Sequence, residues 1–255
     1  MAKSMIYAWE DHYLGIFPAD TYTTEPRVGV TFCIALDNHD IQVSLVDSNV
    51  ISAKSFVIER SVPMSITTKG PAVFINYFPL SLECFSLIEF VGGDGLKVVS
   101  PRFKPSESWV QKMLSNTIDE AELQQAMLDL VLSIEGYKPT NKVLDMRVLH
   151  TIKRIRDTLP ETHSIEQYAK EIQLSKDRLS HLFKENTGYN IKAYTLFEKA
   201  RKALFAMVSG SSFTDAGIEA GFTDAAHFAN TIKKFYGLTL SDISAGMEIQ
   251  LYKSS

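Results

Sequence analysis

The feature of this sequence that most constrains its fold is a pattern that occurs twice between Ser164 and Gly237. Each copy consists of a short capped helix, a tight turn and a second helix whose outer face is polar and basic. The first copy runs from Ser164 to Lys184 and the second from Phe213 to Lys234. A helix, a sharp turn and a second helix form the layout of a DNA reader whose second helix enters the major groove. We therefore expect this stretch to bind double-stranded DNA and the preceding part of the chain to control that binding.

The first copy places polar side chains on the outer face of its second helix. Ser164 and Gln167 have the spacing of a capping box, and Ser175 is placed to cap the second helix. Leu179, Leu182 and Phe183 are expected to face the core. The residues expected to contact DNA are Ser175, Lys176, Asp177, Arg178, Ser180, His181 and Lys184. Arg and Lys can donate to guanine or phosphate, and Ser and His can bond base edges. A solvated helix face is the alternative.

The second copy has smaller side chains. Ser212 is expected to cap its first helix, Gly221 to form the turn and Thr223 to cap its second helix. The inward residues are Phe228, Ile232 and Phe235. The residues expected to contact DNA are Thr223, Asp224, Ala225, Ala226, Ala229, Asn230, Lys233 and Lys234. A helix over residues 190–208, about 28 Å long, joins the two copies. It would set the two reading helices about 34 Å apart, the spacing of successive major grooves.

The charge is unevenly divided along the chain. The net charge is -4, from 26 Lys and Arg and 30 Asp and Glu. Residues 1–140 hold 10 basic and 17 acidic residues, and residues 141–255 hold 16 basic and 13 acidic residues. An acidic module joined to a mildly basic one fits a DNA-binding second half. An uneven solvated surface would give the same numbers.

Length and composition indicate a globular protein of two domains. A chain of 255 residues with 45% hydrophobic residues can bury one or two cores. It has no apolar run of membrane-spanning length and no signal-peptide core at its start. Its two cysteines, Cys33 and Cys84, suit a reducing compartment. We expect a cytoplasmic protein without a membrane contact.

The first half is typical of a β domain. Four runs rich in β-branched and aromatic residues, separated by turn signals, are Val28–Leu36, Ile41–Val46, Ser52–Ile58 and Ala72–Phe78. Short strands at this spacing predict a sandwich or barrel, without fixing the strand order. We place this domain at residues 1–138, a linker at 139–142 and the DNA-binding domain at 143–255.

A helix from about Asp119 to Gly136 carries an apolar stripe. The stripe consists of Leu123, Met127, Leu130 and Ile134. Such a stripe usually covers the core of its own domain. The alternative is a homodimer seam in which the four residues pack against the same helix of a second chain.

The first half offers no catalytic constellation. Its only histidines, His12 and His39, are far apart in sequence, and no nucleophile elbow, phosphate-binding loop or zinc-binding motif occurs. We therefore expect no enzyme activity, metal or cofactor. A set of aromatic residues could line a small-molecule pocket or fill the core: Tyr7, Trp9, Phe17, Phe32, Phe74, Tyr77 and Phe78.

The C-terminal pattern closely resembles the AraC/XylS family of bacterial transcription regulators. The matching residues are Leu174-Ser175, Leu179, Phe183-Lys184, Thr187-Gly188, Tyr194, Ala203, Gly221-Phe222, His227-Phe228, Lys233 and Gly237. The resemblance covers residues near 143–244 and implies an activator that contacts RNA polymerase. It also implies an α+β architecture, with an N-terminal cupin-like β-barrel, dimerisation helices and a C-terminal all-α domain of two helix-turn-helix units joined by a long helix. In this architecture a small-molecule effector acts through the N-terminal domain; regulation of that domain by a protein partner is the alternative.

Four positions depart from the family pattern. Gln173 stands where the first turn usually has Gly, and Gly217 stands where the second unit usually has Ala. Leu240 replaces a usual Pro and Ser244 a frequent Arg. A glycine within a helix costs up to about 1 kcal/mol relative to alanine. Because alanine cannot hydrogen-bond a base, we expect the first unit to read most of the sequence and the second to grip mainly the DNA backbone.

Overall fold

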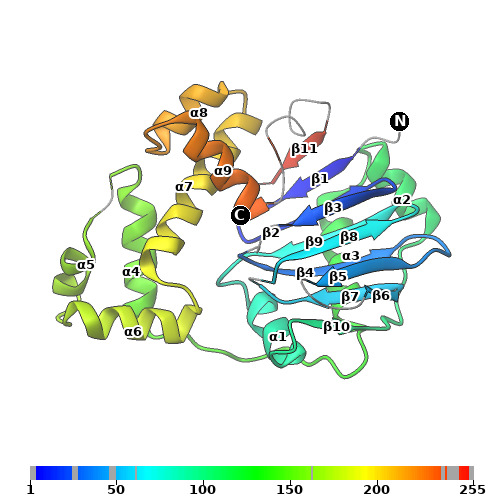
Figure 1. Cartoon of the computed structure of the whole chain (residues 1–255), viewed down its shortest axis with the longest axis horizontal. Helices are drawn as coiled ribbons and strands as arrows, with labels where there is room; N and C mark the ends of the chain where they lie inside the picture. The colour runs from blue at the N-terminus through cyan, green and yellow to red at the C-terminus, as the bar shows by residue number, and fades with distance from the viewer. Residues whose placement is uncertain are drawn as a thin grey trace. The chain divides into compact units, whose positions relative to one another are not determined.

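The structure is a computed structural model of the chain and comprises two compact units. It describes residues 4–24, 28–45, 50–60, 62–161, 163–236, 239 and 247–252, with the backbone alone over 20–24. The first unit contains residues 1–141 and 236–255, and the second contains residues 142–235 (Figure 1). We predicted a second domain extending to residue 255, whereas the last twenty residues group with the first unit.

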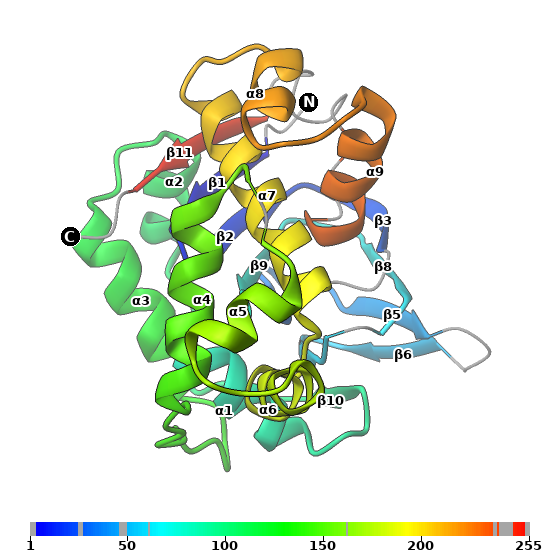
Figure 2. The same cartoon turned by 90° about the vertical axis from the view of Figure 1, so that its left-hand side faces the viewer.

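The first unit is built on two β-sheets. In order across the sheet, the seven-stranded sheet comprises β10 (Leu96–Val98), β7 (Ser55–Ile58), β4 (Val30–Ala35), β9 (Ala72–Tyr77), β2 (His12–Phe17), β1 (Met5–Ala8) and β11 (Glu248–Leu251). The four-stranded sheet comprises β3 (Asp20–Thr24), β8 (Met64–Thr68), β5 (Ile41–Leu45) and β6 (Val50–Ala53). The two sheets lie face to face, and their described strands form separate ladders (Figure 2).

Burial along the strands follows from this layering. All six residues of β9 are buried, because the four-stranded sheet covers one face of the seven-stranded sheet and helices cover the other. These helices are α1 (Leu82–Val91), α2 (Glu107–Leu114) and α3 (Glu120–Leu132). In β8, by contrast, buried residues alternate with half-buried ones, as expected for a sheet with one outward face.

One predicted strand is divided. We expected residues 52–58 to form a single strand, but the chain breaks at Lys54. Residues on either side of the break join different sheets, β6 in the four-stranded sheet and β7 in the seven-stranded sheet. A strand that passes from one sheet to the other needs such a break. The sequence signal there was weak, because neither Gly nor Pro marks the position.

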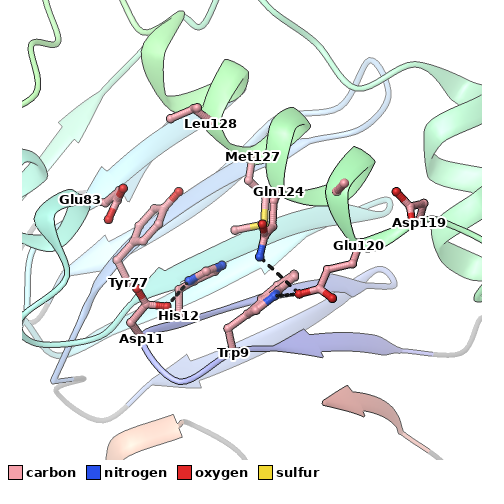
Figure 3. Close-up of a pocket in the computed structure, with 11 residues that line it drawn as sticks. Trp9, Asp11, His12, Tyr77, Glu83, Asp119, Glu120, Gln124, Met127 and Leu128 are labelled. Carbon is pink, nitrogen blue, oxygen red and sulfur yellow. Dashed lines mark hydrogen bonds and ion pairs between the residues drawn. The ribbon is translucent and has the colours of Figure 1, made fainter. Parts of the chain in front are cut away.

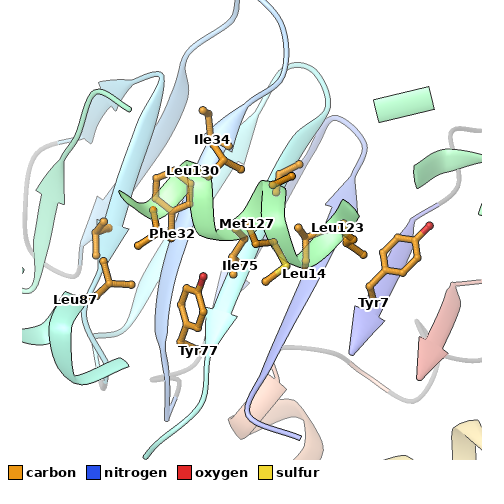
Figure 4. Close-up of a cluster of buried hydrophobic side chains, with 14 of the residues drawn as sticks. Tyr7, Leu14, Phe32, Ile34, Ile75, Tyr77, Leu87, Leu123, Met127 and Leu130 are labelled. Atoms are coloured by element: carbon orange, nitrogen blue, oxygen red, sulfur yellow. The ribbon is translucent and has the colours of Figure 1, made fainter. Parts of the chain in front are cut away.

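The apolar stripe of α3 packs against the seven-stranded sheet. Leu123, Met127, Leu130 and Ile134 are 0–3% exposed and belong to the core of their own unit. Figure 4 shows the first three above the side chains of the sheet. They cannot form a seam with a second chain without leaving this core. The dimer seam predicted on these four residues is therefore wrong, and the stripe covers the core of its own domain.

The C-terminal segment completes the edge of the seven-stranded sheet. Strand β11 pairs in parallel with β1, with Met5 opposite Glu248 and Ala8 opposite Leu251. Beyond it, the ring of Tyr252 stacks on Trp9 at a centroid distance of 5.0 Å. The second unit is thus attached to the first at both of its ends.

Six helices form the second unit. They are α4 (Met146–Thr158), α5 (Ile165–Glu171), α6 (Lys176–Thr187), α7 (Ile191–Val208), α8 (Phe213–Glu219) and α9 (Ala225–Tyr236), which ends at the boundary with the first unit. Helix α7 is the long connecting helix, with the predicted Asn190 as its cap. Helix α6 lies near the start of α7 and α8 packs at its end (Figure 1). Among the described helices, none combines the length and apolar character of a membrane span.

A buried ion network joins α4 to α7. Glu198 is fully buried and contacts Arg156 at 3.0 Å and Arg201 at 2.8 Å. The hydroxyl of Tyr194 donates to the same carboxylate at 2.5 Å. Burial alone would raise the pKa of Glu198, but the charges of Arg201 and Arg156 outweigh it and hold that pKa below its usual value. We did not predict this network, although a glutamate on the inward face of a helix is a signal for one.

Candidate nucleic-acid interface

The first helix-turn-helix consists of α5 and α6. Ser164 caps α5 and forms the predicted capping box with Gln167. Ser175 caps α6, where its hydroxyl accepts a hydrogen bond from the Arg178 amide at 3.2 Å. The three residues predicted to face inward, Leu179, Leu182 and Phe183, are all buried. The packing of this inward face leaves the opposite face of α6 open to a ligand.

The turn between α5 and α6 requires a left-handed backbone. Gln173 has φ of +55°, and the next amide, that of Leu174, donates to the carbonyl of Ala169 at 2.9 Å. Gly221, at the corresponding position of the second helix-turn-helix, has φ of +84°. The departure from glycine at residue 173 therefore puts a side chain where glycine is favoured. The turn therefore has a left-handed backbone with glutamine as it would with glycine, and the glutamine backbone is strained.

The outer face of α6 carries the predicted DNA-contact residues. Ser175, Lys176, Asp177, Arg178, His181 and Lys184 are exposed, and Ser180 is half-buried. Three of them are engaged: the Ser175 hydroxyl caps α6, Lys176 forms an ion pair with Glu166 at 2.6 Å, and the Ser180 hydroxyl donates to the Lys176 carbonyl at 2.9 Å. The side chains of His181 and Lys184 make no hydrogen bond or ion pair with any residue that the structure describes. Together with the exposed Arg178, they can donate to DNA.

The second helix-turn-helix consists of α8 and α9. Ser212 caps α8, as predicted, by accepting from the Asp215 amide at 3.1 Å. Helix α9 begins at Ala225, and the carboxylate of Asp224 accepts from the His227 amide at 2.7 Å. Asp224 is therefore the cap of α9, and the prediction of Thr223 as its cap is wrong by one position. Both residues are equally good caps by type, so the sequence alone favoured neither.

Gly217 makes room for an aromatic cluster. A Cβ at Gly217 would lie 3.0 Å from the ring of Phe228. That ring stacks on Phe213 at 4.7 Å and lies 4.9 Å from Phe222. The glycine that departs from the family pattern thus allows α8 and α9 to pack closely. The other two departures, Leu240 and Ser244, lie outside the described residues, as does Gly237.

The outer face of α9 is smaller and less polar than that of α6. Thr223, Asp224, Ala225, Ala226, Asn230, Lys233 and Lys234 are exposed, and Ala229 is half-buried. The inward residues Phe228, Ile232 and Phe235 are buried, as predicted. His227, which we did not place at the DNA, is also exposed on the first turn. Its ring lies edge-on to Phe222 at 5.4 Å, so it is partly held in place.

The first unit contains a cavity of about 640 Å³. It lies beside the ends of β1 and β2 and beneath α3 (Figure 3). Of the seven aromatic residues proposed for a pocket, Trp9 and Tyr77 line it, and all seven are buried. Both interpretations of the aromatic set therefore hold in part, because most of these rings fill the core and two reach the cavity.

Comparisons with known proteins agree with this geometry. A family model described as a helix-turn-helix domain matches residues 168–245. The arabinose operon regulatory protein of Salmonella typhimurium is 30% identical over 107 residues, which are 41% of this chain and 38% of that protein. Its counterpart from Escherichia coli is 29% identical over 107 residues, 37% of its length. The matched region thus spans less than half of either relative.

A solved structure extends the likeness to the whole fold. The structure of ToxT from Vibrio cholerae with a bound unsaturated fatty acid has a TM-score of 0.58. The match covers 93% of this chain and 96% of ToxT at 11% sequence identity. The shared arrangement of a β-rich unit and a helical unit confirms the two-domain fold class that we predicted, although the described strands form two separate sheets and no closed barrel. The helix-turn-helix match and the arabinose regulators support the resemblance of the C-terminal part of this chain to the AraC/XylS family.

Proposed function

We propose that this protein is a sequence-specific DNA-binding transcriptional regulator that acts as an activator through RNA polymerase. The observation that carries the proposal is the pair of helices α6 and α9, each buried on one face and exposed on the other. They belong to one unit and are joined through α7, whose 18 residues span about 27 Å. The family's reading helices occupy these positions, and their spacing suits two successive major grooves on one side of DNA.

We assign different roles to the two reading helices. Helix α6 offers His181 and Lys184, whose donors can reach base edges or phosphates. Helix α9 offers alanines at 225 and 226, which can contact a thymine methyl group but form no hydrogen bond. Its Lys233 and Lys234 are suited to phosphates. The first helix-turn-helix therefore reads most of the sequence, and the second helix-turn-helix mainly holds the DNA backbone.

A small molecule in the first unit controls this DNA binding in our proposal. The cavity of the first unit has the volume of a drug-sized ligand site, and aromatic and polar side chains line it. The ToxT structure with a fatty acid shows that a protein of this fold holds a small ligand. These two observations favour a small effector over a protein partner. We place the regulator in the cytoplasm, where DNA and effector meet.

We further propose a homodimer that uses the outward face of α3. With the apolar stripe buried, the large exposed apolar residues of this helix are Leu128, which also borders the cavity, and Leu132, at 43% and 46% exposure. They lie four positions apart and so share one side of the helix. A second chain can cover this face without disturbing the core.

A base-substitution scan tests the function and the division of roles. Full-length protein is titrated against the upstream region of its own gene, and each base pair of both half-sites is changed in turn. We expect substitutions under α6 to cost about 1–3 kcal/mol each and those under α9 clearly less. Equal sensitivity in the two halves would refute the division. Binding that never exceeds the affinity for unrelated DNA would refute the function.

A further inference from the structure

The cavity of the first unit is negatively charged at both ends. The carboxylates of Glu83 and Asp11 stand at one end, and those of Asp119 and Glu120 at the other (Figure 3). They come from the start of α1, the turn before β2 and the start of α3. None of the described residues that line the cavity is a lysine or an arginine. A ligand with a single central charge, or with a negative charge, would fit this distribution poorly.

An aromatic floor lies between the two acidic ends. The ring of Trp9 stacks on His12 at 4.5 Å, and His12 lies 5.7 Å from Tyr77. Trp9 is fixed by its indole NH, which donates to Glu120 at 2.8 Å. Aromatic faces attract organic cations and pack against the methylene groups between them. Trp9 is only 3% exposed and stacks on both His12 and Tyr252, so the part of the floor that is open to the body of an elongated cation is the His12 ring.

Tyr77 supplies an observation that is independent of the acidic residues. It is only 4% exposed, and its hydroxyl makes no hydrogen bond to any residue that the structure describes. Figure 3 shows this side chain among those that line the cavity. Burial raises the pKa of Tyr77, and the carboxylates of Glu83 and Asp11 raise it further, so the hydroxyl stays protonated. The hydroxyl of this otherwise buried side chain is therefore open at the cavity, where a ligand or water can form the hydrogen bond that the protein does not supply.

We propose that this cavity binds an aliphatic diamine or polyamine, with one ammonium group at each acidic end and its methylene chain over His12. The inference rests on the proposed function, because it names the chemistry of the effector. It separates this protein from the fatty-acid-bound ToxT structure, whose ligand carries a carboxylate. The Tyr77 hydroxyl completes the site by accepting from the nearer ammonium group.

The cavity borders the C-terminal segment of the first unit. Trp9, on which His12 stacks, also stacks on Tyr252 of that segment. That segment follows α9 in the chain and returns to pair with β1. A ligand that shifts His12 and Trp9 would change the packing of Tyr252 beside the strand that pairs with β1.

Calorimetry on the full-length protein without DNA tests the proposal, since polyamines also bind DNA phosphates. The probes are spermidine and cadaverine, compared with pentylamine, which has one charge, and with decanoate. We expect saturable binding of one spermidine or cadaverine per chain and at least about tenfold weaker binding of pentylamine. Decanoate should not displace bound cadaverine. Glu83→Gln with Glu120→Gln removes one charge from each end and should weaken cadaverine by about tenfold or more.

A matched control makes the test specific. Glu89→Gln with Glu122→Gln makes the same charge changes on α1 and α3, at exposed residues that do not line the cavity. This control should bind cadaverine as the parent does. Equal weakening in both double variants would show a general acidic surface and overturn the proposal, as would binding of decanoate in place of the amines. DNA binding measured separately distinguishes this failure from a failure of the proposed function.

Discussion

Replacing Gln173 by glycine should stabilise the second unit, although it removes a side chain. A left-handed backbone costs an L residue about 1–2 kcal/mol, and Gln173 adopts one with φ of +55°. Glycine loses about 0.5–1 kcal/mol more conformational entropy on folding. The difference predicts a gain of about 0.5–1 kcal/mol in the free energy of unfolding. The side chain of Gln173 is exposed, so its removal opens no cavity.

The second turn provides the matched variant. Gly221→Ala places a Cβ 3.0 Å from the carbonyl oxygen of Pro160 and 3.1 Å from Nζ of Lys199, at φ of +84°. Backbone strain and crowding together predict a loss of about 2–4 kcal/mol. Introducing glycine at residue 173 should therefore raise the free energy of unfolding, whereas removing glycine at the corresponding residue 221 should lower it.

Urea unfolding can follow each unit separately. Both tryptophans, Trp9 and Trp109, belong to the first unit, whereas circular dichroism at 222 nm weights the helical second unit. Gln173→Gly should raise the midpoint of the dichroism transition by about 0.3–0.5 M urea. The midpoint of the transition followed by tryptophan fluorescence should rise as well only if the two units unfold together. A lower midpoint for Gln173→Gly would show that this side chain stabilises the turn, which would refute the reasoning from backbone strain.

Two further predictions concern the buried network and the dimer. Glu198→Gln should lower the free energy of unfolding of the second unit by about 2 kcal/mol, because Arg201 and the partly exposed Arg156 lose the charge of their buried partner and water replaces only part of that interaction. Because the pKa of Glu198 is lowered on folding, its stabilisation is present above the ordinary carboxyl pKa and is lost as the pH falls through the lower folded value. The urea midpoint followed by circular dichroism should fall with decreasing pH in the parent and in the exposed control Glu185→Gln. If it falls by the same amount in Glu198→Gln, the assignment of this pH dependence to Glu198 is contradicted. Leu132→Asp should give a folded monomer by light scattering, whereas a parent that is itself monomeric would refute the dimer.

Much of the helical unit could be predicted from its sequence. The caps at Ser164, Ser175 and Ser212 are local signals, and the inward residues of α6 and α9 follow from helical periodicity. The cap of α9 was misplaced because Thr223 and Asp224 are adjacent residues of similar capping strength. Local patterns of this kind carry the predictions that the structure confirmed.

The first unit was harder to predict because its features depend on pairing between distant segments. Nothing local in residues 248–251 indicates a parallel partner at Met5–Ala8. The stripe of α3 has the same spacing whether a sheet or a second chain covers it, and only the fold shows which. The cavity likewise combines residues from 9 to 128, which no motif connects.

The central claim, that α6 reads sequence and α9 holds the backbone, is tested most directly by DNA binding at two salt concentrations. The full-length parent is compared with His181→Ala, Lys233→Ala and the exposed control Lys192→Ala, on the specific site and on unrelated DNA. We expect affinity to fall with salt, His181→Ala to lose about 1–3 kcal/mol on the specific site alone, and Lys233→Ala to weaken both DNAs with a salt slope smaller by about one. Lys192→Ala should match the parent. If His181→Ala also matches the parent, or if affinity does not depend on salt, the account of this interface is contradicted.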